Sequence, residues 1–272
     1  MIEGHLKKML TTLSDPVEYV LPIGDKRVAL NPYLGKTIKL TYQGEINCSK
    51  CGKKTKKSYS QGFCYPCMTK LAQCDLCIMK PETCHYHLGT CREPQWGEEF
   101  CFQDHFVYLA NSSGLKVGIT RHTQVPTRWI DQGATQALPI FKVKTRLQSG
   151  QVEMALKQHV SDKTDWRKML KGQAESKDLY EERDRLIKTA QSDLSEIQAA
   201  NEDGDIEFIK NAEQVEIKYP VLEYPQKVTS FNFDKTPEIE GRLMGIKGQY
   251  LILDNGVLNI RKFTSYRVQF DG

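Results

Sequence analysis

All nine cysteines of this 272-residue chain fall between Cys48 and Cys101, and the rest of the sequence has none. Whether these cysteines form disulfides or bind metal depends on whether the protein is in an oxidising or a reducing compartment. The first residues, MIEGHLKKMLTTLSDP, contain no uninterrupted apolar core and no small-residue cleavage site. We therefore expect no secretory signal and a cytoplasmic protein. Thiols stay reduced in the cytosol, and closely spaced pairs there predict metal ligands rather than disulfides.

The stretch CSKCGKKTKKSYSQGFCYPC contains two pairs of cysteines, each separated by two residues. Four thiolates suit a tetrahedral Zn²⁺ with bonds of about 2.3 Å, and each pair can bind the ion from one tight turn. Gly52 and Gly62 are well placed for such turns. The predicted ligands of this structural zinc site are Cys48, Cys51, Cys64 and Cys67.

A second group of metal ligands follows in QCDLCIMKPETCHYHLGTCREPQWGEEFCFQDH. Cys74 and Cys77 form a third closely spaced pair. Cys84 completes the set either with His87 or with Cys91, and Cys101 and His105 are further candidates. The spacing does not choose between these sets. We expect a second structural zinc; a catalytic zinc with one open coordination position is the alternative.

Four lysines lie between the first two cysteine pairs: Lys53, Lys54, Lys56 and Lys57. They predict a basic finger that contacts a phosphate backbone. The alternative is a solvated loop that offsets the negative charge of a four-thiolate zinc site. The net charge of the chain is only +4, so any surface for nucleic acid must be local.

The pattern of the chain predicts an α+β protein in five segments. They are an N-terminal β segment (1–47), a cysteine-rich zinc module (48–104), a β-hairpin/α/β/α core (105–172), a charged linker with a solvent-exposed helix (173–207) and a C-terminal β domain (208–272). Short strands and tight turns at Gly248 and Asn255-Gly256 predict a small antiparallel barrel in the last segment. We find no apolar run near the roughly 18 residues of a membrane helix.

The predicted core begins with FVYLANSSGLKVGITR, two β-prone arms joined by turn-forming residues. Pro126 favours a helix start, which places Arg128 in the first helical turn. A further strand, ALPIFKVKTR, precedes a helix that we expect to start at Ser149 and that carries Glu153. The order is therefore hairpin, helix with an arginine, strand, and helix with a glutamate.

In this order the residues resemble the GIY-YIG nuclease superfamily, in particular its shorter, phage-type branch. Phe106-Val107-Tyr108 corresponds to the first family motif and Lys116-Val117-Gly118 to the second. Arg128 and Glu153 fall on the family's helix arginine and metal-binding glutamate. The resemblance covers about 65 residues, from His105 onward. The zinc-rich front together with this core resembles an uncharacterised family of bacterial proteins.

The resemblance implies cleavage of a nucleic-acid phosphodiester with Mg²⁺ or Mn²⁺. It assigns Tyr108 to orienting or deprotonating the attacking water, Arg128 to clamping the phosphate, and Glu153 to holding the metal. Lys116 stands in place of the family's second tyrosine and either acts as a base or binds phosphate. Arg121 is a further candidate contact with nucleic acid.

Two other functions compete with this one. The same fold serves as a non-catalytic module that binds nucleic acid, including RNA, with the zinc knuckles as additional contacts. The third hypothesis is an interaction protein whose zinc modules are purely structural.

Overall fold

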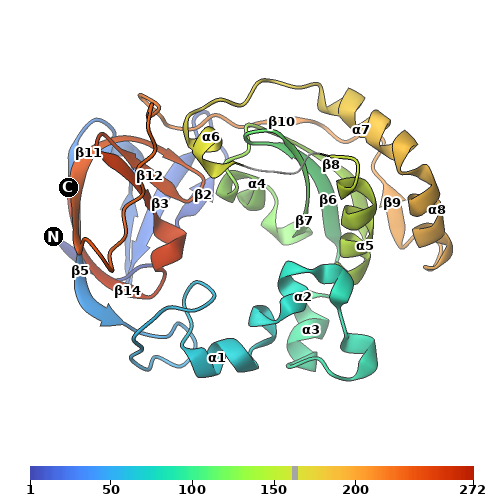
Figure 1. Ribbon diagram of the computed structural model, residues 1–272, viewed down its shortest axis with the longest axis horizontal. Helices are drawn as coiled ribbons and strands as arrows, with labels where there is room; N and C mark the ends of the chain where they lie inside the picture. Colours follow the sequence, from blue (N-terminus) through green and yellow to red (C-terminus); the bar gives the residue numbers. More distant parts are fainter. Residues whose placement is uncertain (161–164) are drawn as a thin grey trace.

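The computed structural model describes residues 1–160 and 165–272, and it shows a mixed α+β protein with three antiparallel sheets (Figure 1). No helix in these described ranges is both long and apolar enough to cross a membrane.

The largest sheet joins the two ends of the chain. Its strands, in spatial order, are β1 (Ile2–His5), β14 (Tyr266–Asp271), β5 (Thr37–Ile46), β11 (Glu238–Lys247), β12 (Tyr250–Leu253) and β13 (Gly256–Asn259). Ile38 and Leu40 alternate with more exposed neighbours along β5, as expected for a strand with one face in the core. A second sheet, β2 (Leu10–Thr12), β3 (Glu18–Ile23) and β4 (Lys26–Ala29), contributes to the same hydrophobic core. We call these two sheets the β unit.

The strands expected to form a separate C-terminal barrel therefore pair with N-terminal strands instead. β11 pairs with β5, and β14 pairs with both β5 and β1. Among the described residues the sheet is open, with β1 and β13 at its edges. Alternation of apolar residues identifies each strand, but it does not say which strand supplies the partner for its free N–H and C=O groups.

The core segment contains the predicted hairpin, β6 (His105–Asn111) and β7 (Leu115–Arg121), beside β8 (Gln136–Val143). Two edge pieces from further along the chain, β9 (Ile206–Phe208) and β10 (Val215–Glu216), also pair with β8. Most residues of these two strands were expected in the C-terminal domain; they pair with the core sheet instead.

Two helices of the core follow β7 and β8. The first, α4 (Thr127–Asp131), starts directly after Pro126, as predicted. The second, α5 (Arg146–Lys157), starts three residues before the predicted Ser149, because Thr145 and Gln148 form a reciprocal capping box. The short helix α6 (Trp166–Leu170) lies near the β unit.

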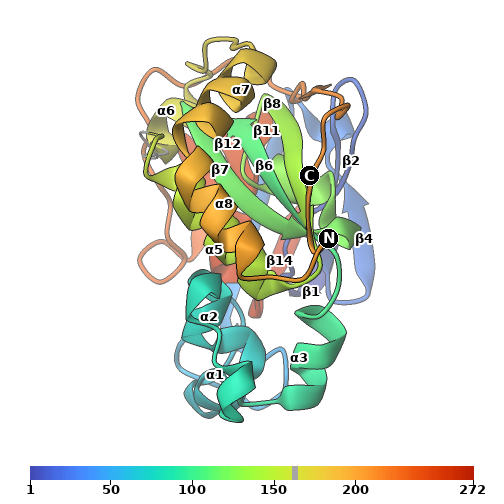
Figure 2. The same cartoon turned by 90° about the vertical axis from the view of Figure 1, so that its right-hand side faces the viewer.

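The charged linker forms two helices, α7 (Leu179–Thr189) and α8 (Gln191–Ala199), which run along the outer side of the core sheet (Figure 2). We expected a solvent-exposed helix. The thin apolar stripe is instead buried: Leu179, Leu186 and Leu194 pack with α5 and the core strands. A narrow apolar stripe is enough to bury a helix that packs only against the edge of a hydrophobic core.

The cysteine segment contains only short helices: α1 (Tyr65–Lys70), α2 (Leu76–Met79), α3 (Pro94–Phe100) and several single 3-10 turns. Figure 1 shows it below the β unit and the core, with α2 near α5. Between Ala72 and Val107, a fully described stretch, the buried residues are Pro81, Gly97 and His105, and no larger aliphatic side chain is buried. Hydrophobic burial therefore contributes little to the order of this part.

Candidate functional site

A pocket of about 450 Å³ lies where three parts of the chain meet. The β7 segment from Lys116 to Arg121 forms one continuous part of its wall. The remaining lining residues come from α4 and the residues beside it, from α5, from the cysteine segment and from the connection between β13 and β14: Ile78, Met79, Pro81, Gln124, Arg128, Gln132, Arg146, Glu153 and Arg261. Five of the lining residues are basic, and Glu153 is the single carboxylate among them. The pocket is therefore suited to an anionic ligand.

Four of the residues singled out from sequence come together in this pocket. Lys116 and Arg121 lie on β7, Arg128 on α4 and Glu153 on α5. Because α5 starts at Arg146, Glu153 lies in the third turn of the helix rather than at its N-terminus. Its place in the pocket therefore depends on the packing of α5 against β7 and not on the helix dipole.

Tyr108 does not line the pocket but lies behind it. Its side chain exposes no surface, and its hydroxyl donates a 3.0 Å hydrogen bond to Oε1 of Gln132. Tyr108 is the register partner of Gly118, and its ring contacts Trp129 edge-on. Burial raises the pKa of Tyr108 to about 12, although the nearby Arg128 acts to lower it. The phenol is therefore neutral near pH 7, which disfavours a role as general base.

Two arginines of the pocket were not predicted from the sequence. Arg146 donates a 2.5 Å hydrogen bond to the carbonyl of Ile78, and its Nε is buried without a hydrogen-bond partner among the described residues. Arg261 lies in the 3-10 helix η6 (Ile260–Phe263) and donates to Oε1 of Gln61 at 2.5 Å. Both residues reach the pocket from distant segments, and neither belongs to a motif that could have identified it.

The cysteine segment holds a third arginine of the pocket by a ring contact. The guanidinium of Arg121 lies 4.9 Å from the ring centroid of Phe100 in α3. Three of the four arginines therefore contact residues of the cysteine segment, through Ile78, Gln61 and Phe100. The predicted basic finger is separate: Lys53, Lys54, Lys56 and Lys57 are exposed and do not line the pocket.

The first cysteine cluster is assembled as predicted. The sulfur atoms of Cys48, Cys51, Cys64 and Cys67 all lie within 4.8 Å of one another. Sγ of Cys51 and Sγ of Cys64 are 3.8 Å apart, which is the edge of a tetrahedron with bonds of about 2.3 Å. The cluster is compatible with a zinc ion bound by four thiolates.

The local backbone favours thiolates at this cluster. Gly52 has a left-handed φ of 69°, and its N–H donates to the carbonyl of Cys48 at 2.8 Å. Burial acts to raise the pKa of Cys48, but backbone N–H groups of Cys51, Cys64 and Lys50 lower it to about 6. A hydrogen bond with Cys64 raises the pKa of Cys67 to about 12. Four thiolates in contact require a cation, and zinc binding would release the remaining protons.

The second group of predicted ligands divides differently from the expected sets. Burial raises the pKa of Cys74, and a hydrogen bond with Ser60 acts to lower it. His87 is exposed. A small cavity of about 20 Å³ is lined by Cys77 together with Cys84, Cys91 and Cys101. Burial, together with the neighbouring Asp75, Cys84 and Cys101, raises the pKa of Cys77 to about 11.

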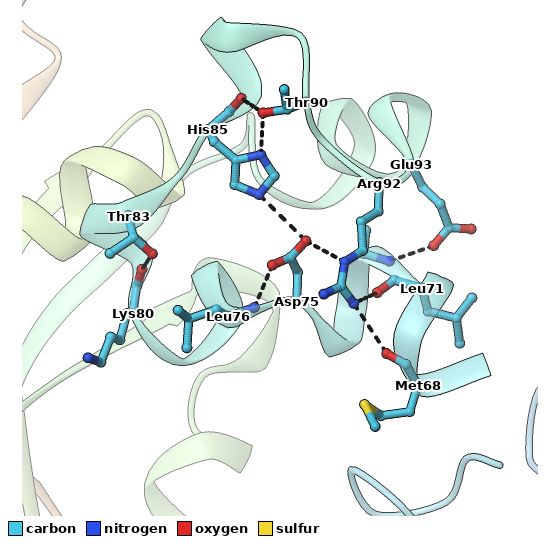
Figure 3. Close-up of polar contacts among 11 residues, drawn as sticks. Met68, Leu71, Asp75, Leu76, Lys80, Thr83, His85, Thr90, Arg92 and Glu93 are labelled. Carbon is cyan, nitrogen blue, oxygen red and sulfur yellow. Dashed lines mark hydrogen bonds and ion pairs between the residues drawn. The ribbon is translucent and has the colours of Figure 1, made fainter. Parts of the chain in front are cut away.

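A polar network that the sequence analysis did not predict borders this cavity (Figure 3). Asp75 caps α2 through the N–H of Leu76 and accepts a 2.7 Å hydrogen bond from Nε of Arg92. Nε2 of His85 lies 3.5 Å from the same carboxylate, and its Nδ1 lies 2.7 Å from Oγ1 of Thr90. Asp75, Cys77 and His85 have potential ligand atoms within 4.8 Å of one another.

Comparison with known proteins gives a family for this chain. The model of the family DUF2797, described as protein of unknown function, matches residues 35–268. No curated protein and no solved structure matches the chain. Because the match covers most of the sequence, from β5 to β14, the protein belongs to the DUF2797 family.

Proposed function

We propose that this protein binds a nucleic-acid phosphodiester in the pocket between β7, α4 and α5, and that it hydrolyses the bond with a divalent cation held by Glu153. The observation that carries the proposal is the composition of the pocket. Lys116 and four arginines surround one carboxylate in a space of about 450 Å³. Structural zinc bound by the first cysteine cluster is part of the proposal.

The arrangement of the elements supports the GIY-YIG-like part of the proposal. The hairpin partner β7, the central β6 and then β8 form consecutive strands of one antiparallel sheet. The helix with Arg128 connects β7 to β8, and the helix with Glu153 follows β8. The resemblance read from the sequence requires the same order of elements.

The pocket provides the groups that phosphodiester hydrolysis needs. The reaction adds a water oxygen to phosphorus while one ester P–O bond breaks, and negative charge accumulates on the phosphoryl oxygens. Arginine guanidinium groups stabilise such charge through paired N–H donors. The buried Nε of Arg146, which has no partner among the described residues, is a donor available to the ligand. A bound Mg²⁺ or Mn²⁺ would activate the water and neutralise charge on the phosphate.

The roles of Tyr108 and Lys116 differ from the family pattern in this proposal. Tyr108 is fully buried and acts as a positioning residue, since its hydroxyl holds Gln132 at the wall of the pocket. Lys116 lines the pocket in place of the second family tyrosine and contributes positive charge beside the phosphate. A divalent cation held by Glu153 would lower the pKa of the attacking water, so the proposal does not require Tyr108 or Lys116 to act as a base.

The test is a cleavage assay with labelled tRNA and plasmid DNA in the presence of Mg²⁺ or Mn²⁺. Glu153→Ala should abolish cleavage and leave the circular dichroism spectrum unchanged. The matched control is Glu196→Ala, which removes an exposed carboxylate from α8 and should cleave at the wild-type rate. Cleavage by Glu153→Ala would remove Glu153 as the metal ligand.

Two features favour a second function, a non-catalytic module for nucleic acid. Lys116 replaces a tyrosine that the resemblance assigns to catalysis, and Tyr108 is sealed from the pocket. In that case affinity should fall steeply with salt concentration, as expected for displaced counterions, while no product appears. The same reaction mixtures distinguish the two functions.

A further inference from the structure

Four of the five cysteines outside the first cluster line one small cavity. Cys77 lies on α2, Cys84 follows the 3-10 turn η3 (Pro81–Thr83), Cys91 precedes α3, and Cys101 ends α3. The cavity measures about 20 Å³, slightly more than the roughly 10–15 Å³ that a single water molecule requires. The cavity is therefore large enough for a single ion or water molecule.

The rest of the cavity wall is mostly apolar. Ile78, Tyr86, Trp96 and Phe102 contribute to it. The rings of Tyr86 and Phe102 contact each other at 4.7 Å between centroids. Thiolates within an apolar shell are typical of structural zinc sites, which are closed to water.

The segment also lacks another source of stability. Between Ala72 and Val107 the buried residues are only Pro81, Gly97 and His105, and the helices have four and seven residues. Segments with so little hydrophobic core usually depend on disulfides or a metal for a fixed structure. All nine cysteines are free thiols in this structure, so disulfides do not supply that stability.

We propose that Cys77, Cys84, Cys91 and Cys101 bind a second structural Zn²⁺ in this cavity. The proposal does not depend on nucleic-acid cleavage. It differs from the ligand sets drawn from spacing, because it leaves out Cys74 and His87 and includes Cys101.

The charges around the cavity fit four thiolates. A zinc ion with four thiolates carries a net charge of −2, and Arg146 lies close enough to Cys77 and Cys101 to interact with both. Arg146 is fixed to this wall through the carbonyl of Ile78, the residue after Cys77. Arg92 is a second cation at the border of the cavity, next to Asp75.

Asp75 and His85 are poorer ligands than the thiols. Both oxygens of the Asp75 carboxylate already accept hydrogen bonds, one from the N–H of Leu76 and one from Arg92. His85 turns its two ring nitrogens toward Asp75 and Thr90 (Figure 3). These groups form a hydrogen-bonded border to the site rather than its coordination shell.

The first experiment counts zinc by elemental analysis in protein purified without chelator. The wild-type chain should contain two zinc ions. Cys84→Ser/Cys101→Ser, which removes two of four ligands, should contain one, and Cys48→Ser/Cys64→Ser should lose the other. Cys74→Ser is the matched control and should keep both ions. A wild-type content of one zinc, or loss of zinc in Cys74→Ser, would overturn the proposal.

A second measurement keeps the proposal testable if the double variants do not fold. The X-ray absorption spectrum of zinc in the wild-type protein should show only sulfur neighbours, at about 2.3 Å. A nitrogen or oxygen neighbour that disappears in His85→Ala or Asp75→Asn would show that the polar border binds the ion, and would refute the four-thiolate site.

Discussion

Gly118→Ala tests whether the close packing behind the pocket is as tight as the structure shows. Gly118 is in the middle of β7, opposite Tyr108 of β6. A Cβ added to Gly118 would lie 2.7 Å from Cζ and 2.7 Å from the hydroxyl oxygen of Tyr108. The backbone of Gly118 is not in the left-handed region, so the substitution introduces a steric contact without backbone strain.

The cost follows from the surroundings of the ring. Tyr108 exposes no surface and lies against Trp129, so the ring cannot move away from the new methyl group without displacing the core. Overpacking of this kind costs about 1–3 kcal/mol. Displacement of the hydroxyl also weakens the hydrogen bond to Gln132, which adds about 1 kcal/mol. We therefore expect Gly118→Ala to lower the free energy of unfolding by about 2–4 kcal/mol.

The assay is urea unfolding followed by circular dichroism. Gly114→Ala in the hairpin loop is the matched control, because an added Cβ there meets nothing within 4 Å. We expect its effect to stay within about 0.5 kcal/mol. The clash should largely disappear when the methyl group is added in a Tyr108→Val background, giving a coupling energy above about 1 kcal/mol in a double-mutant cycle. An equal cost of the methyl group in both backgrounds would refute the reasoning.

Two further predictions concern His105 and Gly150. Burial lowers the pKa of His105 to about 4, below the value of about 6.5 expected in the unfolded chain, so the unfolded state binds more protons between these two pH values. The free energy of unfolding should therefore be highest above pH 6.5 and should fall by about 3 kcal/mol as the pH is lowered to 4. His105→Gln should reduce this loss, measured by urea unfolding at each pH. At Gly150 of α5, an added Cβ would lie 2.5 Å from the backbone nitrogen of Glu82 and 2.7 Å from Cβ of Pro81. Gly150→Ala should therefore weaken the contact between the cysteine segment and α5. Amide hydrogen exchange in residues 75–104 should become faster in this variant and stay unchanged in the control Gly114→Ala. Unchanged exchange in Gly150→Ala would contradict the close contact.

Local patterns predicted the elements of the core better than they predicted their partners. Turn residues between two β-prone arms were sufficient for the β6–β7 hairpin, and Pro126 for the start of α4. The Thr145–Gln148 capping box starts α5 at Arg146, three residues before the predicted Ser149. The pairing of β5 with β11 joins strands about 200 residues apart, and nothing in either strand specifies the other.

The candidate site shows the same limit at the level of single residues. Lys116, Arg128 and Glu153 could be proposed because they occur in an order that resembles a known family. Arg146 and Arg261 could not, since each is an ordinary arginine until the fold brings it to the pocket. For the cysteines, a spacing of two residues identified the first cluster, but it did not indicate which of the other five share a cavity. Cys77 lines the cavity with Cys84, Cys91 and Cys101, and Cys74 is not among its lining residues.

The contacts of the arginines connect the two proposals. Gln61, in the loop between the two pairs of the first cysteine cluster, accepts from Arg261, and Ile78 beside the proposed second zinc accepts from Arg146. Each proposed zinc ion therefore fixes the backbone next to one arginine of the pocket. Loss of either metal would leave that arginine mobile, and an arginine that is not held in place gives less stabilisation to a phosphate because its ordering costs entropy. Zinc would thus be structural in its chemistry and still be required for full affinity in the pocket.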